Sequence, residues 1–156
     1  MKCEPGKPRR SACPLNAVLE TLGDRWSLLI VRDLMFKGRT SYRDFLGAEE
    51  GIATNILSNR LRRLEQWGVI ERRRDPDDAR RLIYGLTAKG INLAPALVEM
   101  ILWGAKHYHT AAPPSVIRRM TENRGRFLAQ LRRRLESGPR AAPGPVRGSR
   151  PASRSK

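Results

Sequence analysis

The spacing of apolar residues changes abruptly at Gly68, and this change constrains the fold more than any other feature of the chain. In the segment 53–67, leucines recur at three- or four-residue intervals, which places them on one face of a helix. These leucines are Leu57, Leu61 and Leu64. Beyond Gly68, two short runs of strand-like composition, 69–73 and 82–86, flank the turn-forming residues 75–79. The sequence therefore predicts a long helix followed directly by a β-hairpin.

Shorter segments with helical spacing precede this helix. The segment 14–22 begins with a proline, which suits the first turn of a helix, and 25–36 follows an aspartate suited to cap it. A third, short helix is expected to begin at Ser41. Its inward-facing residues are expected to be Tyr42, Phe45 and Leu46. With the turn at 47–51 and the long helix, this arrangement predicts a mainly α fold with a small β-hairpin, a winged helix-turn-helix with flanking dimerisation helices.

After the hairpin, Thr87 is suited to cap a further helix, which Pro95 is expected to kink or restart. The residues 111–114 interrupt that helix, and one last helix is expected from a cap at Ser115 to about Leu135. Arginines lie opposite its apolar face, which makes it a basic amphipathic helix. Such a helix can lie on a membrane surface or pack against a second copy of the chain, and we favour the second alternative.

Composition divides the chain into four parts. Proline, glycine and basic residues dominate both ends, which predicts a disordered basic arm at 1–12 and a disordered basic tail at 138–156. Between them we expect a winged helix-turn-helix domain at 13–112 and an additional C-terminal helix within 113–137.

The face of the 53–67 helix opposite its leucines carries side chains that can recognise DNA. Asparagine can hydrogen-bond adenine and arginine can hydrogen-bond guanine, while a hydroxyl in the first turn suits a phosphate. The candidate DNA-binding residues on this helix are Thr54, Asn55, Ser58, Asn59, Arg62 and Arg63. Taken alone, such a face is more often an ordinary solvated surface. Its position in a helix-turn-helix, beside a basic hairpin, favours DNA binding.

The hairpin concentrates positive charge beside that helix. Arg80 and Arg81 are its candidate DNA-binding residues, because an arginine on a wing can enter the narrow minor groove. The alternative is a salt-bridged turn in which Asp75, Asp77 and Asp78 neutralise the arginines. We expect both interpretations to hold in part.

The charge of the whole chain indicates a polyanionic partner. The formal net charge is +16, and residues 13–137 alone carry 22 basic against 14 acidic side chains. The two histidines, His107 and His109, lack a catalytic or metal-ligating pattern, so we expect no enzyme activity, metal or cofactor. No apolar run is long enough to span a membrane, and we expect a cytoplasmic protein with no membrane partner.

Several motifs in a fixed order resemble the HxlR-type winged-helix transcription regulators, relatives of the MarR group. They are CP at 13–14, GDRWSLLI at 23–30, GIATNILSNRL at 51–61, LExxGVI at 64–70 and YGLTxKG at 84–90. The resemblance implies a homodimeric regulator that binds a palindromic operator in double-stranded DNA, more often as a repressor. Ser41 departs from the pattern, since the family often has an arginine there, and this puts a backbone contact in doubt.

The resemblance also implies that the first and late helices form the subunit interface. Both carry more apolar surface than a three-helix core with a wing can cover. The candidate interface residues are Leu15, Val18, Leu19, Leu22, Leu97, Met100 and Ile101. A small-molecule effector is compatible with such a regulator.

Cys13 is a candidate redox sensor, because some members of the family sense oxidants through a cysteine before the first helix. Its place at a helix N-terminus, among basic residues, favours a reactive thiolate. A small residue that packs in the interface is an equally good interpretation. For the whole chain, the alternative function is a non-specific architectural nucleic-acid-binding protein, whose basic ends would give steep salt dependence.

Overall fold

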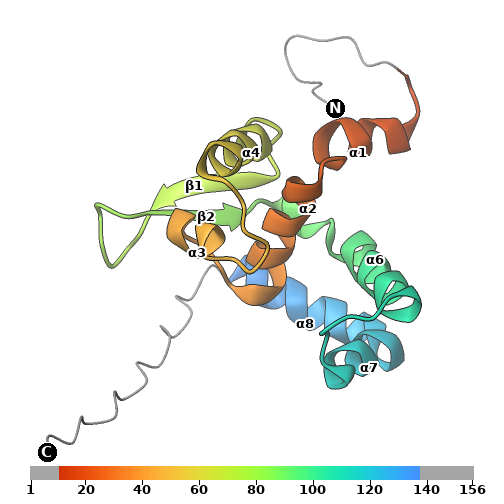
Figure 1. Cartoon of the computed structure of the whole chain (residues 1–156). Helices are drawn as coiled ribbons and strands as arrows, with labels where there is room; N and C mark the ends of the chain where they lie inside the picture. The colour runs from red at the N-terminus through yellow and green to blue at the C-terminus, as the bar shows by residue number, and fades with distance from the viewer. Residues whose placement is uncertain (1–10, 138–156) are drawn as a thin grey trace, which may run out of the picture.

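The computed structural model describes residues 11–137, and most of the predicted arm and the whole predicted tail lie outside this range. Figure 1 shows the arrangement of its elements. They are α1 (Pro14–Leu22), α2 (Arg25–Arg32), the π-helix η1 (Asp33–Lys37), α3 (Tyr42–Leu46), α4 (Thr54–Gln66), β1 (Ile70–Arg74), β2 (Leu82–Leu86), α5 (Ala88–Ile91), α6 (Ala94–His107), α7 (Pro114–Glu122) and α8 (Arg124–Glu136). The predicted fold class, mainly helical with one β-hairpin, is confirmed.

The core lies where α2, η1, α3 and α4 meet the hairpin. Its largest fully buried side chains include Phe45, Met35, Leu57 and Leu64. The Phe45 ring meets the Tyr84 ring edge to face, with centroids 6.0 Å apart, so α3 is locked against β2. This packing fixes the angle between the helix-turn-helix and the wing.

The hairpin is antiparallel, with Ile70 opposite Leu86 and Arg74 opposite Leu82. One further backbone bridge pairs Ser41 with Ile83, and the Tyr84 amide donates to the Thr40 carbonyl over 2.7 Å. The segment before α3 therefore extends the sheet and ties the wing to the helix-turn-helix.

Local capping signals place several helix ends. Asp24 accepts hydrogen bonds from the amides of Trp26 and Ser27, and Thr87 accepts from the Gly90 amide, as the sequence predicts. Ser41 and Asp44 form a reciprocal capping box at α3. This gives Ser41, the departure from the family pattern, a structural role inside the protein.

Two predictions about the helices before the wing are wrong or incomplete. The segment 25–36 is α2 continued by the π-helix, whose Met35 carbonyl accepts a hydrogen bond from Arg134 of α8. Leu46 is exposed, because α3 ends there and its inner face is filled by Phe45.

The predicted last helix is two helices. It starts at Pro114 with Pro113 as the N-cap, not at Ser115, and it breaks at Asn123, where φ is −128° and ψ is 42°. The break turns α8 back beneath η1, so that Leu131 enters the core (Figure 1). Burial of apolar side chains on α8 outweighs the continuity of one helix. No helix within residues 11–137 is long and apolar enough to cross a membrane.

Candidate nucleic-acid interface

The outer face of α4 presents most of the predicted DNA-binding residues to solvent. Because the three inner leucines are buried, the opposite face is fixed outward. The exposed residues on this face are Thr54, Asn55, Ser58, Asn59 and Arg62. Their amides, hydroxyls and one guanidinium form a row along a 13-residue helix that has no acidic residue in its first turn. An N-terminus of this kind favours an anion.

Arg63 lies elsewhere. Its side chain is half-buried, and its guanidinium donates to the backbone carbonyl of Glu20 on α1 over 3.3 Å. Position 63 is one step round the helix from Arg62, and that step turns the side chain from the exposed face towards α1. Arg63 therefore joins two helices of the fold.

An ion pair that sequence reasoning missed holds α4 on α2. Arg60 Nε lies 3.1 Å from Asp24 Oδ1, while the same carboxylate caps α2 and accepts a hydrogen bond from Ser27 Oγ. Burial opposes ionisation of Asp24, but the hydrogen bonds from Ser27 and the charge of Arg60 outweigh it and lower the pKa of Asp24. Asp24 was recognisable as a cap from its position, whereas Arg60 becomes its partner only through the crossing of the two helices.

The N-terminal turn of α4 is also held by α3. The Tyr42 hydroxyl donates to the Thr54 carbonyl over 3.0 Å and lies 3.1 Å from Ser58 Oγ. Ser58 Oγ itself donates to the Thr54 carbonyl. Tyr42 was predicted to face inward, and its ring is half-buried with the hydroxyl directed to α4. These contacts orient the first turn of the helix before any ligand is bound.

The wing combines paired and unpaired arginines. Arg81 Nε lies 3.8 Å from Asp75, Arg72 lies 3.6 Å from Glu65, and the Arg74 guanidinium donates to the Ala79 carbonyl. Within residues 11–137, no ion pair to a carboxylate is recorded for Arg73 or Arg80. The salt-bridged turn is thus part of the arrangement and leaves cationic side chains exposed.

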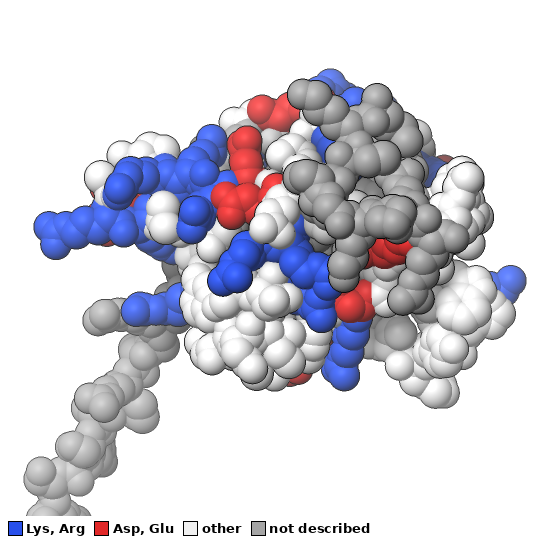
Figure 2. Space-filling model, turned by 90° about the horizontal axis from the view of Figure 1, so that it is seen from above, with Lys and Arg blue, Asp and Glu red and all other residues white. Residues whose placement is uncertain are grey.

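Figure 2 shows basic side chains gathered at the end of the molecule where the hairpin projects. The positive charge of Arg81 also acts on Asp44 at the start of α3. Burial raises the pKa of Asp44, but its hydrogen bonds with Ser41 and Thr40 and the charge of Arg81 together lower it. The capping carboxylate is therefore held ionised beside the wing, so that the wing and α3 are coupled electrostatically.

Exposed apolar side chains lie on α1 and α6. Both helices are on the side of the molecule away from the wing (Figure 1). Leu15 is 65% exposed and Leu19 is 56% exposed, which is unusual for leucines on a folded helix. Sequence reasoning missed two aromatic residues of this surface, Trp103 and Tyr108, whose rings contact each other. The exposed apolar residues of α1 and α6, with the adjoining Tyr108, are Leu15, Val18, Leu19, Met100, Trp103 and Tyr108.

Three of the predicted interface residues are not among these exposed residues. Leu22 and Leu97 are buried in the core of the same chain, and Ile101 is half-buried. Helical spacing places residues on one face but does not say whether that face meets the chain itself or a second copy. Leu22 at the end of α1 and Leu97 in the first half of α6 hold these helices to the core, while the earlier leucines of α1 and the later residues Met100 and Trp103 of α6 remain exposed.

Cys13 is the N-cap residue of α1, and its side chain is exposed. The thiol makes no capping hydrogen bond to the helix. It is therefore accessible to solvent at the start of the helix that carries Leu15 and Leu19.

Several known proteins are similar to this chain in sequence or in structure. An uncharacterized HTH-type transcriptional regulator of Synechocystis sp. is 40% identical over 88 residues, which are 56% of this chain and 64% of the relative. The crystal structure of PA1607, described as a candidate transcription factor, is 36% identical, with a TM-score of 0.60 over 67% of this chain and 72% of that one. The redox regulator HypR in its oxidized form is 25% identical, with a TM-score of 0.56 over 63% of this chain and all of that one.

The family model for HxlR-like helix-turn-helix proteins matches residues 21–112, more than half of the chain. The match contains α4, the wing and the contacts that join them. The chain therefore belongs to the HxlR-like helix-turn-helix family.

Proposed function

We propose that the protein is a sequence-specific DNA-binding transcriptional regulator that acts as a homodimer. The observation that carries this proposal is the exposed row of polar and basic side chains on α4, held in place by Tyr42 and Arg60 and flanked by the arginines of the wing. A rigid helix with outward asparagines and an arginine matches the width and hydrogen-bonding pattern of the major groove.

Within this interface the residues have different roles. Asn55, Asn59 and Arg62 read base edges, because their side chains are long enough and exposed on the outward face. Thr54 and the first-turn amides of α4 bind a backbone phosphate. Arg80 and Arg81 contact the minor groove or its phosphates from the wing.

The exposed apolar surface of α1 and α6 is the proposed dimer interface. Burial of two leucines that are more than half exposed stabilises the association of two copies by the hydrophobic effect. A twofold dimer places two α4 helices about one DNA turn apart, roughly 34 Å, which requires a palindromic operator. Light scattering at micromolar concentration is expected to give twice the mass of the 17.7 kDa chain, and a monomeric mass would contradict the interface.

Repression is the simplest mode of action for such a dimer, because occupancy of an operator alone can block transcription. Two routes of regulation suit the molecule. An effector can bind as a small molecule, or the exposed Cys13 thiol can be oxidised at the start of an interface helix. The structural likeness to HypR, described as a redox regulator, supports the second route. If oxidation of Cys13 regulates the protein, diamide lowers operator affinity in wild type and not in Cys13→Ser. Identical responses of the two proteins would mean that Cys13 is only a small residue that packs in the dimer interface.

The test of specificity begins with duplexes selected from a random pool by the full chain. The regulator is expected to bind a selected palindrome about a thousandfold more tightly than random DNA at the same salt concentration. Asn59→Ala is expected to lower affinity for the palindrome by about 1–3 kcal/mol and to leave binding to random DNA nearly unchanged. Asn123→Ala is the control, because Asn123 is an exposed asparagine between α7 and α8, outside α4, and its side chain makes no capping hydrogen bond.

Two outcomes separate this proposal from the architectural alternative. If no sequence is enriched and affinity depends only on salt, the protein is a non-specific nucleic-acid binder. If Asn59→Ala lowers affinity equally for both DNAs, Asn59 contacts the phosphate backbone and base reading must lie with its neighbours.

A further inference from the structure

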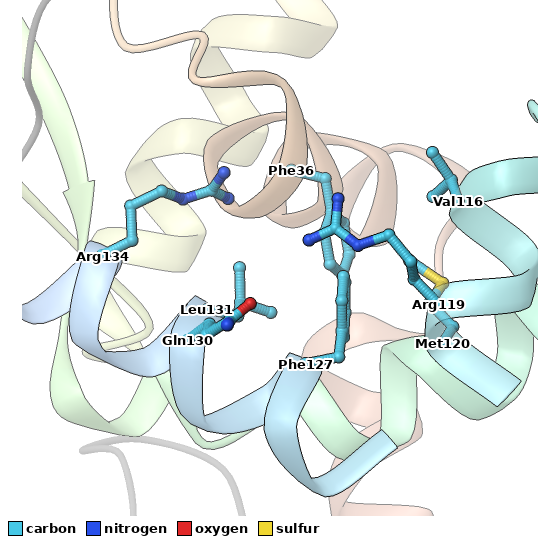
Figure 3. Close-up of a pocket in the computed structure, with 8 residues that line it drawn as sticks. All are labelled: Phe36, Val116, Arg119, Met120, Phe127, Gln130, Leu131 and Arg134. Atoms are coloured by element: carbon cyan, nitrogen blue, oxygen red, sulfur yellow. The ribbon is translucent and has the colours of Figure 1, made fainter. Parts of the chain in front are cut away.

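A cavity of about 360 Å³ lies between η1, α7 and α8. Its apolar wall comes from three elements of the chain, and its deepest side chains, Met120 and Leu131, are buried. Figure 3 shows the lining residues converging on this space from α7 and α8, with Phe36 reaching in from η1. The volume is within the range of pockets that bind small molecules, about 300–1,000 Å³.

Two aromatic rings form one side of the cavity. The rings of Phe36 and Phe127 are nearly parallel, with an interplanar angle of 20° and centroids 6.5 Å apart. Together with Met120 and Leu131 they offer flat and polarisable surfaces. Such a wall favours a ligand with an aromatic ring and disfavours a small inorganic anion, which would lose its hydration there.

Two guanidinium groups, those of Arg119 and Arg134, border this apolar space. Arg119 lies over the Phe127 ring, with its guanidinium carbon 5.9 Å from the ring centroid. Arg134 donates a hydrogen bond to the Met35 carbonyl over 2.6 Å, which uses one of its five donors. Figure 3 shows both groups directed inward from opposite sides of the cavity.

Neither arginine has an ion pair with a carboxylate recorded among residues 11–137. This differs from Arg124 and Arg132 on α8, which pair with Glu99 and Glu136. Positive charge above an aromatic floor is complemented by an anionic group attached to a ring. The C-terminal tail of this chain does not supply it, since residues 138–156 contain five basic and no acidic side chains.

We propose that this cavity is a binding site for a small aromatic carboxylate. The ring packs against Phe36, Phe127 and Met120, and the carboxylate accepts hydrogen bonds from Arg119 and Arg134. Seven of the eight lining residues follow residue 112, where the family match ends, so the site belongs to the α7–α8 extension.

The experiment follows the methionine methyl groups of the full chain by ¹³C NMR during titration with 2-naphthoate. The methyl of Met120 lines the cavity, whereas the methyl of Met100 is on the exposed surface of α6 and serves as the internal control. We expect a saturable shift at Met120 and none at Met100. The neutral isostere 2-naphthamide is expected to bind about tenfold or more weakly, because it cannot form the charge-assisted hydrogen bonds.

Arg119→Met keeps the length of the side chain and removes its charge, and it is expected to weaken 2-naphthoate binding about tenfold. Arg126→Met is the control, because Arg126 is exposed on α8 and does not line the cavity. Arg134→Met also removes the bond to Met35, so Arg119→Met is the decisive variant.

Three results would overturn the proposal: no saturable shift at Met120 up to about 10 mM 2-naphthoate, equal binding of the amide, or unchanged binding by Arg119→Met. The measurement contains no DNA. Its failure would therefore leave the proposed regulator function standing, and failure of that function would leave this site standing.

Discussion

The winged helix and the α7–α8 pair are both built from helices with apolar stripes, but they are held in different ways. In the winged helix, polar groups at fixed positions join neighbouring elements, as Asp24 joins Arg60 and Tyr42 joins the first turn of α4. The α7–α8 pair is held mainly by apolar burial of residues such as Leu131. The comparison teaches that directional contacts position the elements of the helix-turn-helix, while the extension is positioned mainly by apolar packing, to which Arg124, Arg132 and Arg134 add contacts with Glu99, Asn92 and the Met35 carbonyl.

Backbone packing shows the same difference. At Gly90 in α5, an added Cβ would lie 2.2 Å from the Val69 carbonyl oxygen, whereas at Gly125 in α8 no atom lies within 4 Å of such a Cβ. The chain approaches itself closely at Gly90, beside the wing, and leaves space at Gly125, while Gly85 within β2 is as open as Gly125. Substitutions can test how far this difference extends.

Gly90→Ala is expected to give the largest effect. The new methyl group would overlap backbone, which cannot move away as a flexible side chain could, so unfolding free energy should fall by about 3 kcal/mol or more. Urea denaturation followed by circular dichroism measures it.

Gly125→Ala is the control, and it is expected to be neutral or stabilising by up to about 1 kcal/mol, because alanine favours a helix. Similar losses for the two variants would show that the extension is packed as closely as the wing, and the contrast between the two regions would be lost.

Leu131→Ala tests whether the extension folds together with the winged helix. Leu131 is 5% exposed and belongs to the same core cluster as the inner leucines of α4. We expect a loss of about 2–3 kcal/mol in global unfolding free energy, from lost burial and the cavity that remains. Amide exchange in α4 should accelerate with that in α8, whereas Arg126→Ala, exposed on the same helix, should change neither.

If exchange accelerates in α8 alone, the extension opens as a separate unit, and the single core described above would have to be divided. In that case the cavity between η1 and α8 would also open and close independently of the DNA-binding elements.

The features that the sequence predicted correctly are those set by residues close together in the chain. The bounds 14–22 and 82–86 and the caps at Asp24 and Thr87 were predicted correctly, because each depends on residues close together in the chain. The exposure of Asn55 and Asn59 followed from the burial of leucines on the same helix. Local propensity and helical spacing are sufficient for features of this kind.

Features that depend on contacts distant in sequence were missed. The break at Asn123 depends on α8 finding room against η1, and Arg63 is drawn to Glu20, 43 residues away. Likewise, Leu22 and Leu97 share apolar spacing with exposed neighbours, and only tertiary packing separates core from surface. Spacing identifies a face but not what covers it.

The wing arginines provide a smaller test of the comparison. Changing Arg80 and Arg81 together to Ala should weaken DNA binding by about 1 kcal/mol and flatten the slope of log affinity against log salt by one to two units. Changing Arg126 and Arg133 of α8 together should leave the slope unchanged, since they lie on the extension. Equal slopes for both double variants would mean that the extension also contacts the DNA or that the wing does not.

The smallest expected effect concerns Asp24, whose carboxylate joins α2 to α4. Its pKa is lowered in the folded protein from the ordinary value of 3.8, because the Ser27 hydrogen bonds and the Arg60 charge outweigh burial. A lowered pKa means that the stabilisation is fully present above the unfolded value and is lost as pH falls through the folded one. Asp24→Asn keeps a capping oxygen but cannot titrate, so its unfolding free energy should fall less steeply than that of wild type below about pH 4. Arg60→Met should reduce the same slope in part, because Arg60 supplies only part of the shift. Urea unfolding at stepped pH measures all three proteins, and parallel curves would mean that the Asp24–Arg60 contact positions α4 without contributing to acid stability.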